Sequence, residues 1–183
     1  MKTLVFHRSP LLKLTFSAMF LAIGMVLPFF TGNIPEIGAS LCPMHIPVLL
    51  CGYICGAPWG TMVGMVLPLL RSAVIHMPPM MPTAAAMAFE LAAYGLVAGL
   101  FPRSFVRKPA GLYVSLLTAM TAGRIVWGLA SAVLYASMGS AFSWALFAAG
   151  AVLNALPGIV LQLILIPAVI YALTHARLIP LDK

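Results

Sequence analysis

Long runs of apolar residues, broken by short polar or Pro- and Gly-rich stretches, fill most of this 183-residue chain. Hydrophobic residues make up 63% of the sequence and charged residues only 7%. A helix needs about 20 mostly apolar residues to cross a bilayer, so the chain has room for about six such helices. The pattern therefore predicts an all-α integral membrane protein, a single transmembrane domain over residues 1–183 that forms a six-helix bundle.

Proline, glycine and charged residues mark where the apolar runs end. The predicted spans lie at about residues 11–30, 44–56, 57–75, 83–101, 111–137 and 143–174. The first run is longer than the apolar part of a signal peptide and lacks a small-residue cleavage site, so we take it as a span. Pro157 and Pro167 fall inside the last span and predict kinks there. The stretch 56–60 predicts a tight turn between the second and third spans.

The basic residues lie at the chain ends and in one loop. Eight of the ten lysines and arginines fall on one side of the membrane if the N-terminus is cytoplasmic: Lys2, Arg8, Lys13, Arg103, Arg107, Lys108, Arg177 and Lys183. Cytoplasmic loops carry an excess of Lys and Arg. The distribution therefore predicts a multi-pass protein of the cytoplasmic membrane with both termini in the cytoplasm. The net charge of +7 reflects this bias and does not indicate nucleic-acid binding.

Four polar residues lie inside or at the edge of predicted spans, on four different helices: Arg71, Glu90, Arg124 and Asn154. Ionisable groups at membrane depth are costly and usually functional. At 1.5 Å of rise per residue, Glu90 and Arg124 lie about 10 Å below the outer face and Asn154 about 16 Å below it. Arg71 lies near the outer end of its span. The four residues therefore predict one substrate site in the outer half of the membrane.

The charges in this predicted site leave two interpretations open. Glu90 and Arg124 can form a structural ion pair, with Arg71 extending to the membrane interface. Alternatively, two arginines against one glutamate leave a positive charge that a ligand carboxylate would balance. Trp127 shares the helix face of Arg124 and is a candidate for ring stacking, although packing or interface anchoring also explains it. Tyr94, one turn from Glu90, either orients Glu90 or lines the site.

Small residues at i and i+4 predict close helix contacts, at Ala18 and Ala22 in the first span and at Gly60 and Gly64 in the third. His45 lies at the predicted external boundary, where we expect it to face solvent or pack in a loop.

Nothing in the sequence indicates a reaction. Catalytic triads, His-Glu-x-x-His runs and phosphate loops are absent from it, and three acidic residues leave little for acid–base or metal catalysis. The three cysteines, Cys42, Cys51 and Cys55, are expected to be small buried residues, with a soft-metal site as the alternative. We expect a protein that is not an enzyme and needs no cofactor or metal.

Several segments resemble the substrate-binding S components of energy-coupling factor (ECF) vitamin transporters. They are Pro43-Met-His-Ile-Pro47, the residues Gly52, Gly56, Pro58 and Gly60, the run Pro68-Leu-Leu-Arg71, and Ala122-Gly-Arg-Ile-Val-Trp-Gly128. The resemblance implies a membrane-embedded binder of a vitamin or precursor, with its pocket near the outer face and the loop between the first two spans as a lid. It also implies docking to a transmembrane coupling protein and two ATPase subunits, with Ala18 and Ala22 on the docking surface.

The substrate stays open at this stage. The excess of arginine favours a carboxylate-bearing compound such as pantothenate or a folate. The N-terminus lacks the metal-binding histidine directly after Met1, where Lys2 stands, which disfavours the nickel and cobalt members of the family. The alternative function is an autonomous small secondary transporter or a channel for an organic solute.

Overall fold

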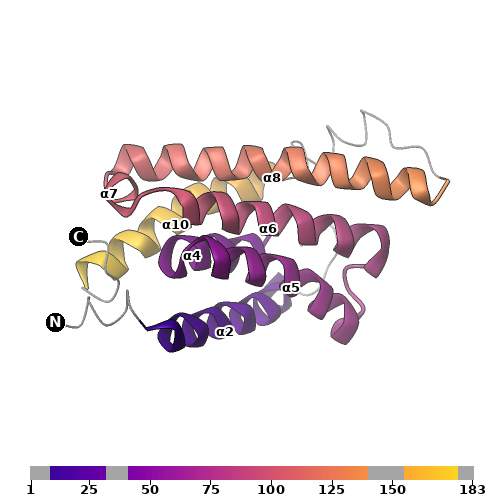
Figure 1. Cartoon of the computed structure of the whole chain (residues 1–183), viewed down its shortest axis with the longest axis horizontal. Coiled ribbons are helices and arrows are strands. Elements are labelled where there is room, and N and C mark those ends of the chain that lie inside the picture. The colour runs from indigo at the N-terminus through magenta and orange to yellow at the C-terminus, as the bar shows by residue number, and fades with distance from the viewer. Residues whose placement is uncertain (1–8, 32–40, 140–154, 177–183) are drawn as a thin grey trace.

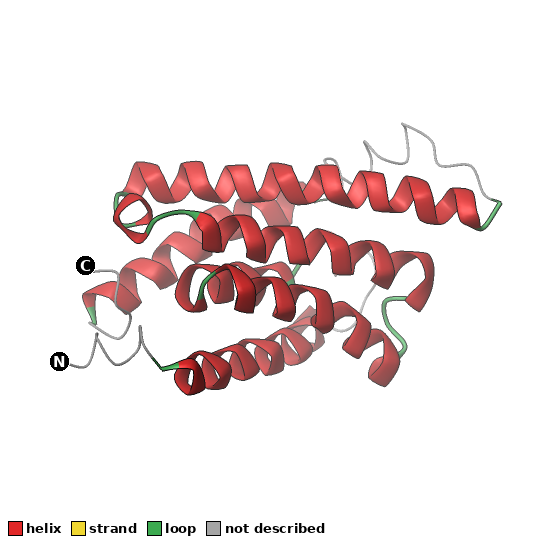
Figure 2. Ribbon diagram, in the orientation of Figure 1, coloured by secondary structure: helices red, strands yellow, loops and turns green. Residues whose placement is uncertain are grey.

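The computed structural model describes residues 9–31, 41–139 and 155–176 (Figure 1). Its longer helices are α2 (Pro10–Val26), α4 (His45–Cys55), α5 (Ala57–Ile75), α6 (Ala85–Leu100), α8 (Pro109–Ser137) and α10 (Leu156–His175). Three short helical pieces join them: η1 (Leu27–Thr31), η2 (Met80–Ala84) and α7 (Arg103–Val106). Within these ranges the chain contains no strand (Figure 2), which confirms the all-α prediction.

Five stretches of the described chain are long and apolar enough to cross a membrane. The predicted second span is the exception, because α4 has only 11 residues and is about 16 Å long. Every residue of α4 is buried, and α2, α5, α6 and α10 pack around it. A helix enclosed by protein does not need to match the bilayer thickness. Five long helices are therefore found in the described part, and the predicted count of six spans is not confirmed.

The start of the last helix differs from the prediction. Pro157 lies in the first turn of α10, where its missing N–H leaves no hydrogen bond unmade. The predicted kink at Pro157 is therefore wrong, whereas Pro167 does lie inside the helix. Residues 143–154 of the predicted span lie outside the described residues. The predicted turn at 56–60 is shorter in the structure. Gly56 alone, with a positive φ of 97°, connects α4 to α5.

Glycines allow α4, α5 and α6 to pack backbone against backbone. A Cβ on Gly60 would lie 2.7 Å from Cα of Gly52 and 2.8 Å from the carbonyl oxygen of Gly95. A Cβ on Gly64 would collide with the backbone of Leu91. The predicted close contact at Gly60 and Gly64 is confirmed, with α6 as the partner helix. We call the five glycines at these crossings the glycine seam: Gly52, Gly60, Gly64, Gly95 and Gly99.

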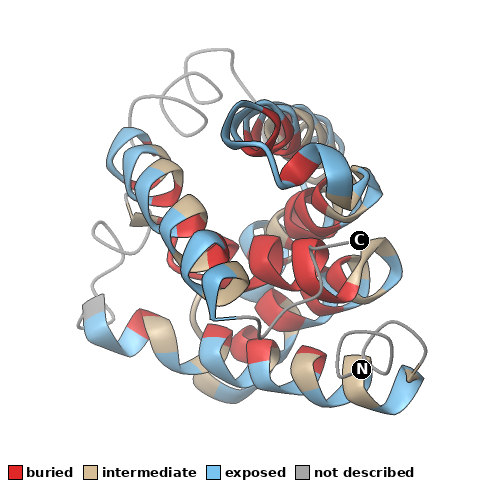
Figure 3. Ribbon diagram, turned by 90° about the vertical axis from the view of Figure 1, so that its left-hand side faces the viewer, coloured by how far each residue is buried: buried red, intermediate tan, exposed pale blue. Residues whose placement is uncertain are grey.

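The start of α2, the short helix α7 and the start of α8 lie at one end of the bundle (Figure 1), and this end carries the described basic residues other than Arg71 and Arg124. We call this the basic end and define it by Lys13, Arg103, Arg107 and Lys108. Seen from this end, the buried residues face the inside of the bundle and the exposed ones face outward (Figure 3). Many of the exposed residues are large and apolar, as lipid-facing positions require.

Candidate functional site

Glu90, His45 and Arg124 bring three helices together in the interior. Glu90 on α6 is only 1% exposed, and its Oε1 lies 2.9 Å from Nη1 of Arg124 on α8. The same oxygen lies 3.3 Å from Nε2 of His45, the first residue of α4. The predicted meeting of Glu90 and Arg124 is therefore present, and a histidine joins it.

Close packing of α6 against α8 explains how Arg124 reaches Glu90. The preceding residue, Gly123, lies against the ring of Tyr94, which a Cβ at this position would overlap. Tyr94 is buried, one turn from Glu90, and its ring meets that of His45 edge to face with centroids 5.0 Å apart. Tyr94 therefore packs between the helices that carry the charged groups, as expected for a residue that orients them.

Cys42 completes the group from the segment that leads into α4. Its Sγ lies 3.6 Å from Nη2 of Arg124, and its carbonyl accepts a hydrogen bond of 3.1 Å from the N–H of His45. Cys42 adopts a positive φ of 47°, which turns the chain into the helix at this point. We call the five residues of this site the polar cluster: Cys42, His45, Glu90, Tyr94 and Arg124.

Several buried atoms of the polar cluster make no hydrogen bond within the described residues. They are both ring nitrogens of His45, Oε1 of Glu90 and Nε of Arg124. The contacts of Glu90 with Arg124 and His45 are short enough for hydrogen bonds, but their angles are outside hydrogen-bond geometry. An unsatisfied buried polar group costs about 1–3 kcal/mol, so such groups usually have water or a ligand as a partner.

Arg71 contacts the end of α2. Its side chain is buried, and Nη1 donates a hydrogen bond of 2.7 Å to the carbonyl of Met25. The guanidinium also lies 5.2 Å from the ring centroid of Phe29. These contacts connect α5 to α2.

The other predicted site residues have different positions. Trp127 lies half-buried on α8, one turn beyond Arg124. Asn154 lies outside the described residues. Ala18 and Ala22 lie on the exposed face of α2, while Ser17, Phe20 and Gly24 face the bundle. The alanines are therefore available to a partner helix rather than packed in the interior.

Two members of the polar cluster were missed as site residues by the sequence reasoning. His45 was expected to face solvent or a loop, and this is wrong, because it is only 3% exposed. Cys42 was expected only to be small and buried, and it is buried beside Arg124. A histidine between two prolines in an apolar stretch was the available signal, but its depth depends on α4 beginning inside the bundle.

Gln162 on α10 is a further buried polar residue that the sequence reasoning missed. It is only 1% exposed, and its Oε1 has no hydrogen-bond partner among the described residues. It shares the buried face of α10 with Gly158 and Ile166, and α10 packs against α4 and α8.

The polar cluster offers hydrogen-bond donors and acceptors to a polar group. In the described ranges, no three His, Cys, Asp or Glu side chains are grouped so that they could hold a metal ion. Glu90 supplies an acceptor and Arg124 a donor, and their charges balance. This pair can recognise a polar organic group through directional hydrogen bonds.

The comparisons with known proteins give one result. The model of the family described as "ECF transporter, substrate-specific component" matches residues 12–170. Comparison with curated proteins gives no match, and comparison with solved structures gives none either.

Proposed function

Because the chain belongs to the family of substrate-specific components of ECF transporters, we propose that its polar cluster binds the transported solute. The family match confirms the resemblance found in the sequence, and the long apolar helices agree with a multi-pass membrane subunit. Members of this family are transporter subunits and not enzymes. We propose that the solute is a water-soluble vitamin or a related precursor.

The observation that carries this proposal is the set of buried, unsatisfied atoms on His45, Glu90 and Arg124. A purely structural ion pair would be expected to satisfy both partners, because stranded polar atoms reduce stability. A binding site tolerates this cost, because the ligand supplies the missing partners. The cluster also lies in the half of the bundle away from the basic end, since Glu90 is five residues from the start of α6.

The geometry favours a ligand that both donates and accepts hydrogen bonds. Arg124 would donate to the ligand through Nε, and Glu90 would accept from it. Arg71 donates to the carbonyl of Met25 on α2, and Arg124 is the arginine that the described ion pairs place beside Glu90. A carboxylate can therefore bind Arg124 best if the same molecule also donates to Glu90. Pantothenate and folates carry both kinds of group and fit this requirement.

Neighbouring residues receive supporting roles in this proposal. Tyr94 holds the ring of His45 and thereby the geometry of the cluster. Gln162 would supply a directional hydrogen bond from α10, which covers part of the same predicted span as Asn154. Trp127 would cover an apolar part of the ligand. Arg71 would anchor the end of α2. The loop that follows α2 is the lid that the resemblance implies.

We also propose that α2 docks to a transmembrane coupling protein that works with two ATPase subunits. The support is the exposed pair Ala18 and Ala22, since small residues let helices approach closely in a membrane. Affinity purification from the native host should recover these three partners with the tagged chain. Solute transport by the reconstituted chain alone, driven by an ion gradient, would contradict this proposal and favour the secondary transporter.

A pair of variants tests the proposed site. Arg124→Ala alone strands Glu90 and should destabilise the protein, whereas adding Glu90→Gln should restore stability. The ligand itself is identified by mass spectrometry of the small molecule that copurifies with the unmodified chain. We expect the double variant to be stable but to copurify without this molecule. Arg103→Ala, which removes an arginine at the basic end, is the control and should keep it. A stable double variant that still binds the molecule normally would contradict the proposed site, and Glu90 and Arg124 would then form a structural ion pair only.

A further inference from the structure

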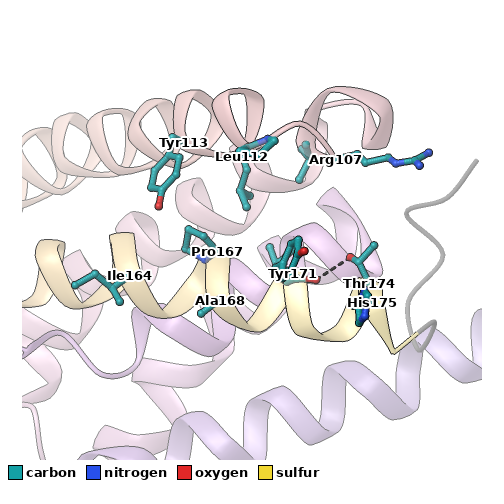
Figure 4. A pocket seen from close by; sticks show the side chains of 12 residues that line it. Arg107, Leu112, Tyr113, Ile164, Pro167, Ala168, Tyr171, Thr174 and His175 are labelled. Atoms are coloured by element: carbon teal, nitrogen blue, oxygen red, sulfur yellow. Dashed lines mark hydrogen bonds between the residues drawn. The ribbon is translucent and has the colours of Figure 1, made fainter.

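A cavity of about 700 Å³ lies between α8 and α10 at the basic end of the bundle (Figure 4). Its volume is within the range of pockets that hold small organic molecules, about 300–1,000 Å³. None of its lining residues belongs to the polar cluster. The residues used in the argument below are Arg107, Ile164, Ala168, Tyr171, Thr174 and His175.

Along α10, the lining of the cavity is about as long as one leaflet of a bilayer. Its lining on α10 extends from Ile164 to His175, the last residue of the helix. These residues cover about 17 Å of helix axis. The hydrocarbon core of a bilayer is about 30 Å thick, so this distance reaches from the interface to about the midplane.

The lining changes from polar to apolar along this length. Arg107 and His175 lie at one end, next to the ends of α7 and α10 (Figure 4). Ile164 and Ala168 line the end farther from these polar residues. Tyr171 is 73% exposed and lies near the polar end, where tyrosines are enriched at membrane interfaces. The cavity therefore suits a molecule with a polar head and an apolar chain.

The charge around the polar end favours an anionic head. Arg107 is exposed, and Lys108 and Arg103 lie within four residues of it. Glu90 is the single acidic residue in the described ranges, and it is paired with Arg124 in the polar cluster. No described carboxylate therefore competes for Arg107. Basic pockets between membrane helices on the cytoplasmic side are typical sites for anionic lipid head groups.

We propose that this cavity binds an anionic phospholipid, with one acyl chain between α8 and α10 and the phosphate next to Arg107. His175 contributes a second polar group at the same end, and its ring stacks on Tyr171 with centroids 6.2 Å apart. The hydroxyl of Thr174 already donates to the carbonyl of Ile170 at 2.7 Å, so Arg107 is the main donor. A lipid in this position would fill the space between α8 and α10 and connect the last helix to the bundle.

Native mass spectrometry of the delipidated full chain tests this proposal. The probes are phosphatidylglycerol and phosphatidylcholine with identical acyl chains, and inorganic phosphate. We expect one tightly held phosphatidylglycerol and no retained phosphate. Arg107→Gln should weaken phosphatidylglycerol binding about fivefold, as the loss of about one kcal/mol per basic residue implies. Lys108→Gln removes a neighbouring charge that does not line the cavity, and it should have a smaller effect.

A second pair of variants tests the acyl-chain part of the cavity. Ala168→Trp fills the cavity and should displace both lipids, whereas Ala172→Trp places the same ring on an exposed position of α10 outside the lining. Equal lipid retention by Ala168→Trp and Ala172→Trp would overturn the proposal in favour of non-specific lipid contact. Loss of copurifying coupling protein in Ala168→Trp, with lipid binding unchanged, would overturn it in favour of a protein partner.

Discussion

The glycine seam and the polar cluster both hold α6 against its neighbours, but they do so in opposite ways. At the glycine seam, α5 approaches α6 so closely that a Cβ on Gly60 would lie 2.8 Å from the carbonyl oxygen of Gly95. At the polar cluster, α6 meets α4 and α8 through charged side chains. The seam has no side chain to satisfy, whereas the cluster has four buried atoms without a described hydrogen bond.

This difference separates a region built for close packing from the region that we propose binds the solute. Close packing of small residues is a general means of joining helices where lipid offers no hydrophobic driving force. A buried ion pair is weak evidence for stability, since well-packed apolar residues are often equal or better. We therefore expect that larger residues at the glycine seam will destabilise the protein. Apolar residues in place of the charged pair of the polar cluster should still allow it to fold.

The largest effect should come from removing one charge of the polar cluster. Glu90→Leu leaves Arg124 buried without its anion and should lower the free energy of unfolding by about 3–5 kcal/mol. Glu90→Leu combined with Arg124→Met replaces both charges by apolar groups and should recover most of this loss. Denaturant titration in detergent micelles measures both values. A double variant as unstable as the single one would mean that the cluster is part of the structural framework, and the comparison would fail.

The glycine seam should respond to a single methyl group. Gly95→Ala places a Cβ against the backbone of Gly60, which cannot rotate away, so we expect a loss of about 3 kcal/mol, the upper part of the overpacking range. Ala136→Leu adds a larger group at an exposed position of α8 and should change stability little. Thermal unfolding of both variants under the same conditions checks the difference. Equal melting temperatures would show that the helices can separate locally at no cost.

A smaller effect is expected where α4 meets α8 outside the polar cluster. The hydroxyl of Tyr53 lies 3.0 Å from that of Ser115, and both side chains are buried. Tyr53→Phe should cost about 1 kcal/mol, the usual net value of a hydrogen bond. Tyr113→Phe removes an exposed hydroxyl from α8 and serves as the control. If Tyr53→Phe lowered the free energy of unfolding more than Gly95→Ala does, the contact between Tyr53 and Ser115 would be a main support of the bundle, and the expected order would be wrong.

The smallest effect on stability should come from the exposed face of α2. Ala18→Leu or Ala22→Leu adds bulk where the structure leaves open space, so the unfolding free energy should stay within about 0.5 kcal/mol of the unmodified protein. Solute transport by the complete transporter should nevertheless fall, while solute binding to the isolated chain persists. Leu14→Phe, also on an exposed part of α2, controls for bulk alone. Parallel loss of binding and transport would mean that these alanines support the interior.

Much of this arrangement could be predicted from particular residues. The third span was predicted at residues 57–75 and α5 is Ala57–Ile75, because proline and glycine mark both of its ends. Glu90 and Arg124 were predicted at the same depth and lie 2.9 Å apart. Arg71 was predicted to belong to the same site from its depth alone, and that stays a prediction, while its Nη1 contacts the carbonyl of Met25 on α2.

The sequence by itself determined the all-helical membrane class and most helix boundaries. These properties follow from local rules, since apolar length must match the bilayer and proline and glycine interrupt helices. Only the tertiary structure decided that α4 is a short enclosed helix, that His45 meets Glu90 and that Arg71 contacts the end of α2. Those outcomes depend on how each helix rotates about its axis, and this rotation is set by side-chain packing between residues far apart in the chain, such as Gly123 against Tyr94.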